Sequence, residues 1–242
     1  MTQLFLSLII PAYNEEQRIV HTLEICLSYL RRQSYSSEII IVDDGSTDNT
    51  AILVENIAKE CENVRLLRLS HKGKGWAVKS GMLSGSGKYR FLADADLSMP
   101  IEYIDRFLPP INVDTDIAIG SREHHGAKRF NEPILRHIQG RVFNWAVRAL
   151  AVRGIKDTQC GFKCFSEKAV NILFPLQISN GFGFDVEILF LAQKNCLTIK
   201  EIPIDWYHHE GSKVRPIIDS ILMFRDILAT RINHLKGKYR LH

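Results

Sequence analysis

The sequence predicts an α/β fold, a single domain with a mostly parallel, doubly wound central sheet flanked by helices and an amphipathic helix at its carboxyl end. Short apolar runs typical of buried strands alternate with longer amphipathic segments through the first half of the chain. At 242 residues the chain is long enough for one sizeable α/β core and too short for two. Charges interrupt every apolar run well before the roughly 18 residues that a membrane-spanning helix needs, so we expect no transmembrane segment.

The first two strands are predicted at 4–10 and 38–42, because both are continuous apolar runs of the kind found in parallel strands buried on both faces. Asn14 follows the first strand and is expected to cap the helix after it. An acidic turn that begins with Asp43 and Asp44 follows the second strand and leads into a second helix.

The third and fourth strands are predicted at 64–69 and 90–93. Between them, 72–79 is a basic, glycine-rich turn that opens a helix but lacks the spacing of an ATPase or dinucleotide loop. The fourth strand ends in Asp94 and Asp96. Since the carboxyl ends of parallel strands meet at one edge of a sheet, the acids after the second and fourth strands should lie together there.

Asp94 and Asp96 allow two interpretations. Two ionised carboxylates this close repel each other, which favours a cation between them. Hard oxygen ligands in small number suit Mg²⁺ or Mn²⁺ held jointly with phosphates. Alternatively, both residues belong to a turn that caps a helix starting near Pro100.

The second half of the chain is less regular. Its predicted segments are a strand running into a loop, a long helix, a polar loop, the start of another helix and a short late strand, at 117–122, 135–152, 153–163, 181–188 and 202–206. Asp185 and Glu187 fall in the first turn of the later helix, where acids favour the helix dipole without any chemistry.

The carboxyl-terminal segment 216–235 carries a broad apolar stripe at helical spacing with arginines interspersed. It predicts either a helix packed on the domain or a basic amphipathic helix lying on an anionic membrane surface.

The composition of the whole chain limits its partners. The 31 Lys and Arg against 27 Asp and Glu leave a net charge of +4, which fits phosphorylated ligands or an anionic membrane surface and does not call for nucleic acid. Five scattered cysteines without zinc spacing indicate reduced thiols and a cytoplasmic protein.

Three motifs, in this order and spacing, resemble those of the inverting family 2 glycosyltransferases, which have the GT-A fold. They are Pro11-Ala-Tyr-Asn-Glu-Glu16, Val42-Asp-Asp-Gly-Ser46 and Ala93-Asp-Ala-Asp96. Three later segments closely resemble the dolichyl-phosphate β-glucosyltransferases and, more distantly, the dolichyl-phosphate mannose synthases. These are Arg153-Gly-Ile-Lys-Asp-Thr-Gln-Cys-Gly-Phe-Lys163, Phe184-Asp-Val-Glu187 and Glu210-Gly-Ser-Lys213. The similarity extends over nearly the whole chain.

The resemblance implies metal-dependent, inverting transfer of a hexose, glucose from UDP-glucose, to a polyprenyl or dolichyl phosphate. We expect a glycosyltransferase domain at 1–212, with a nucleotide-sugar half at 1–122 and an acceptor half at 123–212. The basic segment 213–242 would then contact the cytoplasmic face of a membrane peripherally. A homo-oligomer or a membrane partner protein is left open.

Carried onto this sequence, the resemblance places the nucleotide sugar against Pro11, Tyr13, Glu15, Val42, Asp44, Ala93, Asp94, Ala95 and Asp96. Asp94 and Asp96 match the metal motif for Mg²⁺ or Mn²⁺, with Asp96 as the direct ligand. Arg122 and Lys213 match basic positions that hold the donor diphosphate or the acceptor phosphate. Asp185 is the candidate for a general base, although an acceptor phosphate is already ionised at neutral pH and needs little help from one.

Three alternatives accompany this prediction. A related family 2 enzyme could use a saccharide hydroxyl as acceptor, which would require a base and a sugar-binding cleft. A polyprenyl-phosphate mannosyltransferase would use GDP-mannose instead. From another class, the chain could be an inactive nucleotide-binding subunit of a membrane complex.

Overall fold

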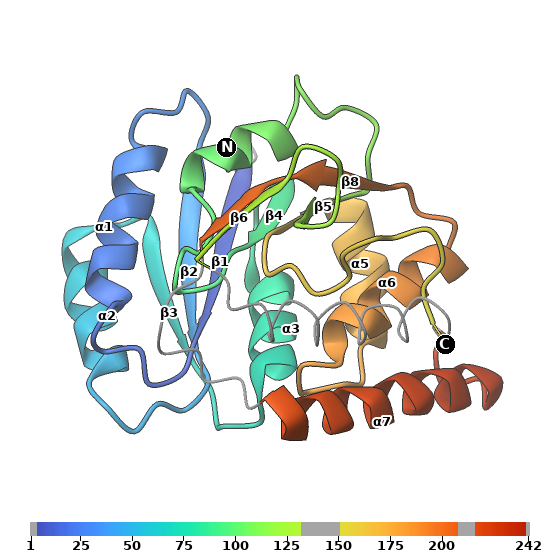
Figure 1. The fold of residues 1–242 in the computed structure, drawn as a ribbon. Coiled ribbons are helices and arrows are strands. Elements are labelled where there is room, and N and C mark those ends of the chain that lie inside the picture. Colours follow the sequence, from blue (N-terminus) through green and yellow to red (C-terminus); the bar gives the residue numbers. More distant parts are fainter. Residues whose placement is uncertain (1–3, 132–150, 208–215, 241–242) are drawn as a thin grey trace.

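The computed structural model describes residues 4–131, 151–207 and 216–240, with side chains described throughout except at 216–220 (Figure 1). Seven of the described strands form one sheet in the order β3-β2-β1-β4-β7-β5-β8. Their bounds are β1 Leu6–Ala12, β2 Ser37–Asp43, β3 Val64–Arg68, β4 Tyr89–Leu92, β5 Ile117–Ser121, β7 Lys163–Ser166 and β8 Ile199–Pro203. β6 (Lys128–Phe130) and β9 (Asp205–Tyr207) pair in a separate small sheet.

The strand pairings confirm the predicted, mostly parallel sheet. β1 runs parallel to both β2 and β4, β2 runs parallel to β3, and β5 runs parallel to β8. β7 is the exception, because it lies between β4 and β5 and is antiparallel to both. The amino end of β7 therefore lies at the same edge of the sheet as the carboxyl ends of β4 and β5.

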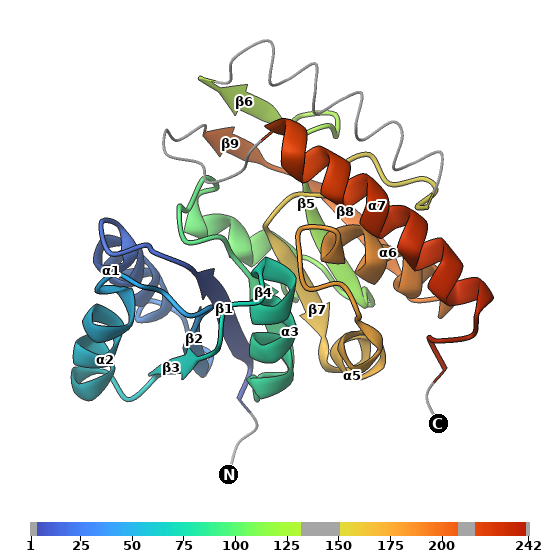
Figure 2. The same ribbon diagram turned by 90° about the horizontal axis from the view of Figure 1, so that it is seen from below.

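Helices cover both faces of this sheet, as Figures 1 and 2 show. Alternate residues of the central strand divide between the two faces: Leu8 and Ile10 pack with one apolar cluster and Ile9 with the other. The first cluster includes α1 (Ile19–Leu30), α2 (Thr50–Glu60) and the 3₁₀ helix η1 (Ile101–Phe107). The second includes α3 (Lys74–Ser84), α5 (Glu167–Leu176) and α6 (Phe184–Lys194).

Two local predictions are wrong. Asn14 does not cap α1, which begins at Ile19; its backbone is left-handed, at φ 54°, and its Oδ1 accepts a hydrogen bond from Thr47 N at 2.8 Å. The single strand predicted at 202–206 is divided between β8 and β9, which belong to different sheets. The helix predicted at 135–152 falls almost wholly in 132–150, outside the described residues.

The helix predicted near the carboxyl end is α7 (Pro216–Leu235), which crosses beside α6 in both views (Figures 1 and 2). Met223, Ile227 and Thr230 are buried, so one face of α7 packs on the domain. A second face is apolar and exposed, and it comprises Ile221, Phe224, Leu228, Ile232 and Leu235. In the described part of the chain, no helix combines the length and the hydropathy needed to cross a bilayer.

Candidate functional site

The predicted acidic residues lie at one edge of the sheet. Ala12 pairs with Asp43, so β1 and β2 end at the same level, and Leu92, the last residue of β4, pairs with Ile9, so β4 ends three residues before β1 at the same edge. The segments that follow them carry Tyr13, Glu15, Asp44, Asp94 and Asp96. The expectation that the two acidic clusters share an edge is confirmed.

Asp94 is held by contacts from two distant segments. Lys74, the first residue of α3, places its Nζ 2.6 Å from Asp94 Oδ1. On the other side, the carboxylate lies against Gly161, where an added Cβ would come within 1.9 Å of Asp94 Oδ2. Burial alone would lower the pKa of Lys74, but the charges of Asp94 and Asp185 and the contact with Asp94 raise it overall. Lys74 is therefore a cation fixed on the first acid of the pair.

Asp96 is half-buried, and its Oδ1 accepts a hydrogen bond from the backbone N of Ser98 at 3.0 Å. Within the described ranges, no three His, Cys, Asp or Glu side chains come together as a metal-binding group. Asp94 and Asp96 thus supply two hard carboxylate donors at one strand end, and Gly161 leaves room for one of them. This donor set fits Mg²⁺ or Mn²⁺ that takes its remaining ligands from phosphates and water.

Three polar residues predicted to bind the nucleotide, Tyr13, Glu15 and Asp44, are each held by a neighbouring group. Tyr13 stacks on His71, with ring centroids 4.2 Å apart and planes 20° from parallel. Asp44 accepts hydrogen bonds from the backbone N of Lys72 and of Gly73, at 3.0 and 2.8 Å, so it holds the loop that precedes α3. The carboxylate of Glu15 lies 2.8 Å from Arg18 Nε.

The remaining residues predicted for this pocket are buried, and they are Pro11, Val42, Ala93 and Ala95. Val42 is fully buried, and a Cβ added at Gly81 of α3 would lie 2.7 Å from its Cγ2. Its side chain therefore packs β2 on α3. These four residues shape the site through packing and backbone position.

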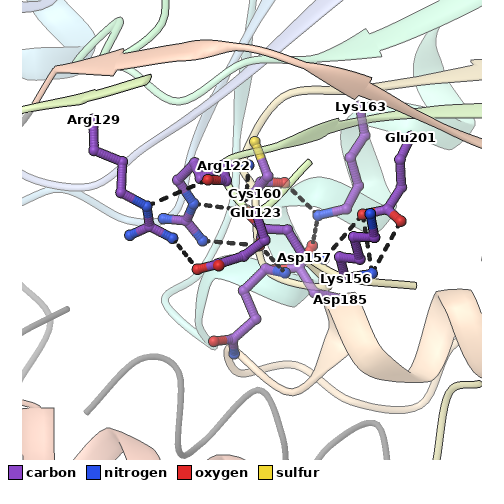
Figure 3. Close-up of polar contacts among 10 residues, drawn as sticks. Arg122, Glu123, Arg129, Lys156, Asp157, Cys160, Lys163, Asp185 and Glu201 are labelled. Atoms are coloured by element: carbon purple, nitrogen blue, oxygen red, sulfur yellow. Dashed lines mark hydrogen bonds and ion pairs between the residues drawn. The ribbon is translucent and has the colours of Figure 1, made fainter. Parts of the chain in front are cut away.

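Arg122 follows β5 and is bound by Asp157 (Figure 3). The guanidinium contacts both carboxylate oxygens, with Nε 2.7 Å from Oδ2 and Nη2 2.9 Å from Oδ1. Burial alone would raise the pKa of Asp157, but the charge and hydrogen bonds of Arg122 lower it to about 2. Glu201 of β8 accepts hydrogen bonds from the backbone N of Lys156 and of Asp157, which fixes the loop that carries the acid. The guanidinium is thus held in one orientation at the edge of the site.

Lys163 and Asp185 form a second buried ion pair, also drawn in Figure 3. Lys163 Nζ lies 2.5 Å from Asp185 Oδ1 and donates a second hydrogen bond to the carbonyl oxygen of Cys160. Burial raises the pKa of Asp185, and the charges of Lys163 and Lys74 offset that rise only in part. The carboxylate of Asp185, which was predicted as a general base, is therefore already engaged in an ion pair with Lys163.

Glu187, two residues further along α6, has a structural role. Its carboxylate accepts hydrogen bonds from the backbone N of Ile178 and Ser179 and, at 2.6 Å, from the hydroxyl of Tyr239. Burial raises the pKa of Glu187, and these hydrogen bonds oppose the rise. This acid ties α6 to the loop before it and to the chain after α7.

Sequence reasoning missed three site residues, Lys74, Asp157 and Lys163. The last two belong to the segment 153–163, which was noted for its polar character and its resemblance to the dolichyl-phosphate β-glucosyltransferases, but neither residue was assigned a role. Lys74 was visible as part of a basic turn, but its partner Asp94 lies twenty positions further on. Lys213, predicted as a phosphate ligand, lies outside the described residues. Lys74, Lys163 and Arg122 each form an ion pair with an aspartate, which is Asp94, Asp185 and Asp157 in turn.

Comparison with known proteins gives this arrangement a context. The family model for glycosyl transferase family 2 matches residues 7–171. The chain is 39% identical to the dolichyl-phosphate β-glucosyltransferase of Saccharomyces cerevisiae, over 98% of this chain and 77% of that protein. It is 34% identical to the Homo sapiens protein of the same name, over 98% of this chain and 78% of that protein.

Among solved structures, glucosyl-3-phosphoglycerate synthase from Mycobacterium tuberculosis has a similar fold. Its complex with UDP superposes with a TM-score of 0.71 at 18% identity, covering 95% of this chain and 80% of that one. Its complex with Mn²⁺, UDP and glucosyl-3-phosphoglycerate gives a TM-score of 0.70 at 18% identity, with the same coverage. At this identity the likeness shows the GT-A fold alone, which confirms the predicted fold class.

Proposed function

Since the chain belongs to glycosyl transferase family 2, we propose that it transfers glucose from UDP-glucose to dolichyl or another polyprenyl phosphate, giving a β-linked product by inversion. The observation that carries the proposal is the similarity to dolichyl-phosphate β-glucosyltransferases over 98% of the chain. The glycosyltransferase domain is assigned to 1–212 and a membrane-facing segment to 213–242.

The acidic pair supports a metal-dependent reaction. Asp94 and Asp96 would hold Mg²⁺ or Mn²⁺, with Asp96 as the direct ligand. When bound, the ion would neutralise charge that develops on the departing nucleoside diphosphate. Tyr13, Glu15 and Asp44 would contact the nucleoside, and the stacking of Tyr13 on His71 supports this proposal by showing that its ring can pack face to face with another ring.

Arg122 would supply positive charge for the donor diphosphate or the acceptor phosphate, at the edge of the sheet where the acidic residues lie. Its orientation is set by Asp157, whose low pKa keeps the acid ionised at neutral pH. A guanidinium fixed in advance needs no reorganisation when negative charge develops near it, and this is the most effective form of electrostatic stabilisation. Lys213 is proposed as a second phosphate ligand.

The nature of the acceptor explains why a free base is dispensable. A phosphate is anionic at neutral pH, whereas a sugar hydroxyl must lose a proton during attack. The acid suggested for that task, Asp185, is paired with Lys163 at 2.5 Å. Asp185 therefore fits a role in positioning charge better than one in taking up a proton, which favours a phosphate acceptor.

The exposed stripe on α7 supports contact with a membrane, where a polyprenyl lipid is found. Ile221, Phe224, Leu228, Ile232 and Leu235 follow one another at spacings of three or four residues, so they align on one side of the helix. Helical geometry places Arg225 and Arg231 along the two edges of this stripe. Apolar residues flanked by arginines suit the interface of an anionic bilayer, and we assign α7 to the cytoplasmic face.

The experiment that tests the function uses the purified chain with dolichyl phosphate, a divalent ion and a panel of labelled nucleotide sugars. We expect lipid-linked label from UDP-glucose. Label from GDP-mannose alone would reassign the donor, and label in an added oligosaccharide but not in lipid would overturn the phosphate acceptor. An absence of transfer with every donor would favour an inactive nucleotide-binding subunit.

A further inference from the structure

The contact between Lys74 and Asp94 raises a question about the metal site. Lys74 Nζ lies 2.6 Å from Asp94 Oδ1, and Asp94 is one of the two acids assigned to the metal. An ammonium group and a divalent cation at the same carboxylate repel each other and compete for its negative charge. A metal ion held directly by Asp96 would draw on the negative charge of the neighbouring Asp94 as well, and it would therefore weaken this ion pair.

The surroundings of Lys74 hold its backbone in place. Gly73, just before it, has φ 118°, a conformation that favours glycine. Trp76 N donates a hydrogen bond to the carbonyl oxygen of Asn180 at 3.1 Å, and a Cβ added at Gly75 would lie 2.7 Å from Gly181 O. The backbone of the first turn of α3 is thus closely packed, so a change in the contact with Asp94 would come from the side chain of Lys74.

A second acid lies near this side chain. Asp185 is close enough for its charge to act on Lys74, and it is fixed by Lys163 at 2.5 Å. A lysine that is also subject to the charge of Asp185 can leave Asp94 while it remains near opposite charge. Its movement then costs less than exposing an unpaired ammonium group in a partly buried site.

We propose that Lys74 is an exchangeable counter-ion of the donor site. Without nucleotide sugar it occupies the cation position at Asp94. When the donor binds with its metal ion, Lys74 leaves Asp94 and contacts the diphosphate, to which it contributes positive charge. This inference rests on the proposed use of a nucleoside diphosphate sugar.

An exchangeable Lys74 and a purely structural Lys74 predict different effects on metal binding when the lysine is removed. Loss of a purely structural lysine would disorder Asp94 and weaken the binding of both metal and donor. Loss of a competing cation should instead strengthen the binding of metal alone. The same loss should weaken the binding of donor, because the diphosphate loses a positive partner.

The test compares Lys74→Met with the wild-type chain. Mn²⁺ binding without nucleotide is followed by electron paramagnetic resonance, and UDP-glucose binding at saturating Mn²⁺ by calorimetry. We expect Mn²⁺ alone to bind about tenfold tighter to the variant and UDP-glucose about tenfold weaker, each change corresponding to about 1.4 kcal/mol. Unchanged or weaker Mn²⁺ binding by a folded variant would overturn the proposal.

Two further variants control for charge and folding. Lys74→Arg keeps the competing cation, so its Mn²⁺ affinity should stay near the wild-type value. Lys72→Met removes a nearby lysine whose Nζ lies 4.5 Å from the centre of the Trp76 ring, and it should leave Mn²⁺ binding unchanged. Thermal melts of all variants identify any that unfold. In that case, Lys74→Gln replaces the methionine variant.

Failure of this proposal is distinguishable from failure of the proposed function. If the wild-type chain transfers glucose but Mn²⁺ binds no tighter to Lys74→Met, only the counter-ion role is overturned. If Mn²⁺ binds tighter to the variant but the wild-type chain transfers no glucose to lipid, the competition at Asp94 is supported and the transfer function is not.

Discussion

Gly161 lies against the carboxylate of Asp94 more closely than any residue with a side chain could. The nearest carboxylate oxygen would be only 1.9 Å from an added Cβ. This glycine comes from the polar loop before β7, whereas Asp94 follows β4, so the contact exists only in the folded chain. The position of Asp94, a proposed metal ligand, thus depends on residue 161 having no side chain.

We predict that Gly161→Ala displaces Asp94 and leaves the fold intact. The value of kcat/KM for glucosyl transfer should fall about tenfold to a hundredfold, the range seen when groups that orient metal ligands are altered. Gly181→Ala is a matched control, because an added Cβ there would be 3.6 Å from the nearest described atom, an ordinary contact. Equal kcat/KM values for wild type and Gly161→Ala would remove Asp94 from the proposed site.

The pairing of Arg122 with Asp157 predicts a change in stability with pH. The pKa of Asp157 falls from 3.8 in an unperturbed aspartate to about 2 in the folded chain. A lowered pKa contributes stability above the unfolded value, and this contribution is lost as the pH falls from about 4 to about 2. The shift corresponds to about 2 kcal/mol.

We therefore expect Asp157→Asn to lower the free energy of unfolding by about 2 kcal/mol or more at neutral pH. The difference between wild type and variant should narrow as the pH falls from about 4 toward 2. Urea titrations at a series of pH values measure this difference in the free energy of unfolding. A difference that does not change with pH would contradict the assignment of this acid as the ionised partner of Arg122.

At the scale of elements, α6 and the loop before it connect the site with α7. Glu187 of α6 holds the backbone N of Ile178 and Ser179, and Ser179 Oγ lies 3.3 Å from Asp226 Oδ2 of α7. The next residue, Asn180, accepts the hydrogen bond from Trp76 N near the start of α3. A helix assigned to the membrane surface is thus in contact with the segment that positions Lys74.

For α7 we predict that Leu228→Gln combined with Ile232→Gln weakens binding to vesicles of phosphatidylcholine and phosphatidylglycerol at least about tenfold, because two exposed apolar side chains lose their burial in the interface. Ile52→Gln is the matched control, since Ile52 is 54% exposed on α2, a different helix. Sedimentation with vesicles measures the bound fraction. Equal binding by the double variant and the wild type would rule out this face of α7 as the contact.

At the scale of the whole molecule, the alternation of apolar runs and amphipathic segments was sufficient to predict the parallel strands of the first half of the chain. The strands predicted at 4–10, 38–42 and 64–69 correspond to β1, β2 and β3. Such runs are informative because parallel strands buried on both faces are apolar throughout. The shared edge of the acidic clusters followed from that topology.

The antiparallel strand β7 could not be predicted in the same way. It is only four residues long, from Lys163 to Ser166. Its first residue, a buried lysine, was predicted to be the end of the polar loop 153–163. What makes it a strand is pairing with β4 and β5, each more than forty residues earlier. Asp157 and Gly161 escaped prediction for the same reason, since their partners Arg122 and Asp94 are distant in the sequence.

The measurement that tests the central claim most directly is the structure of the product made from UDP-glucose and dolichyl phosphate. The purified chain is incubated with both and a divalent ion, and the lipid product is analysed by mass spectrometry and by proton NMR of its anomeric position. Asp96→Asn provides the blank. We predict one glucose on the lipid phosphate in the β configuration, formed by the wild-type chain and not by the variant. An α-linked product, or equal yields from both proteins, would contradict the account.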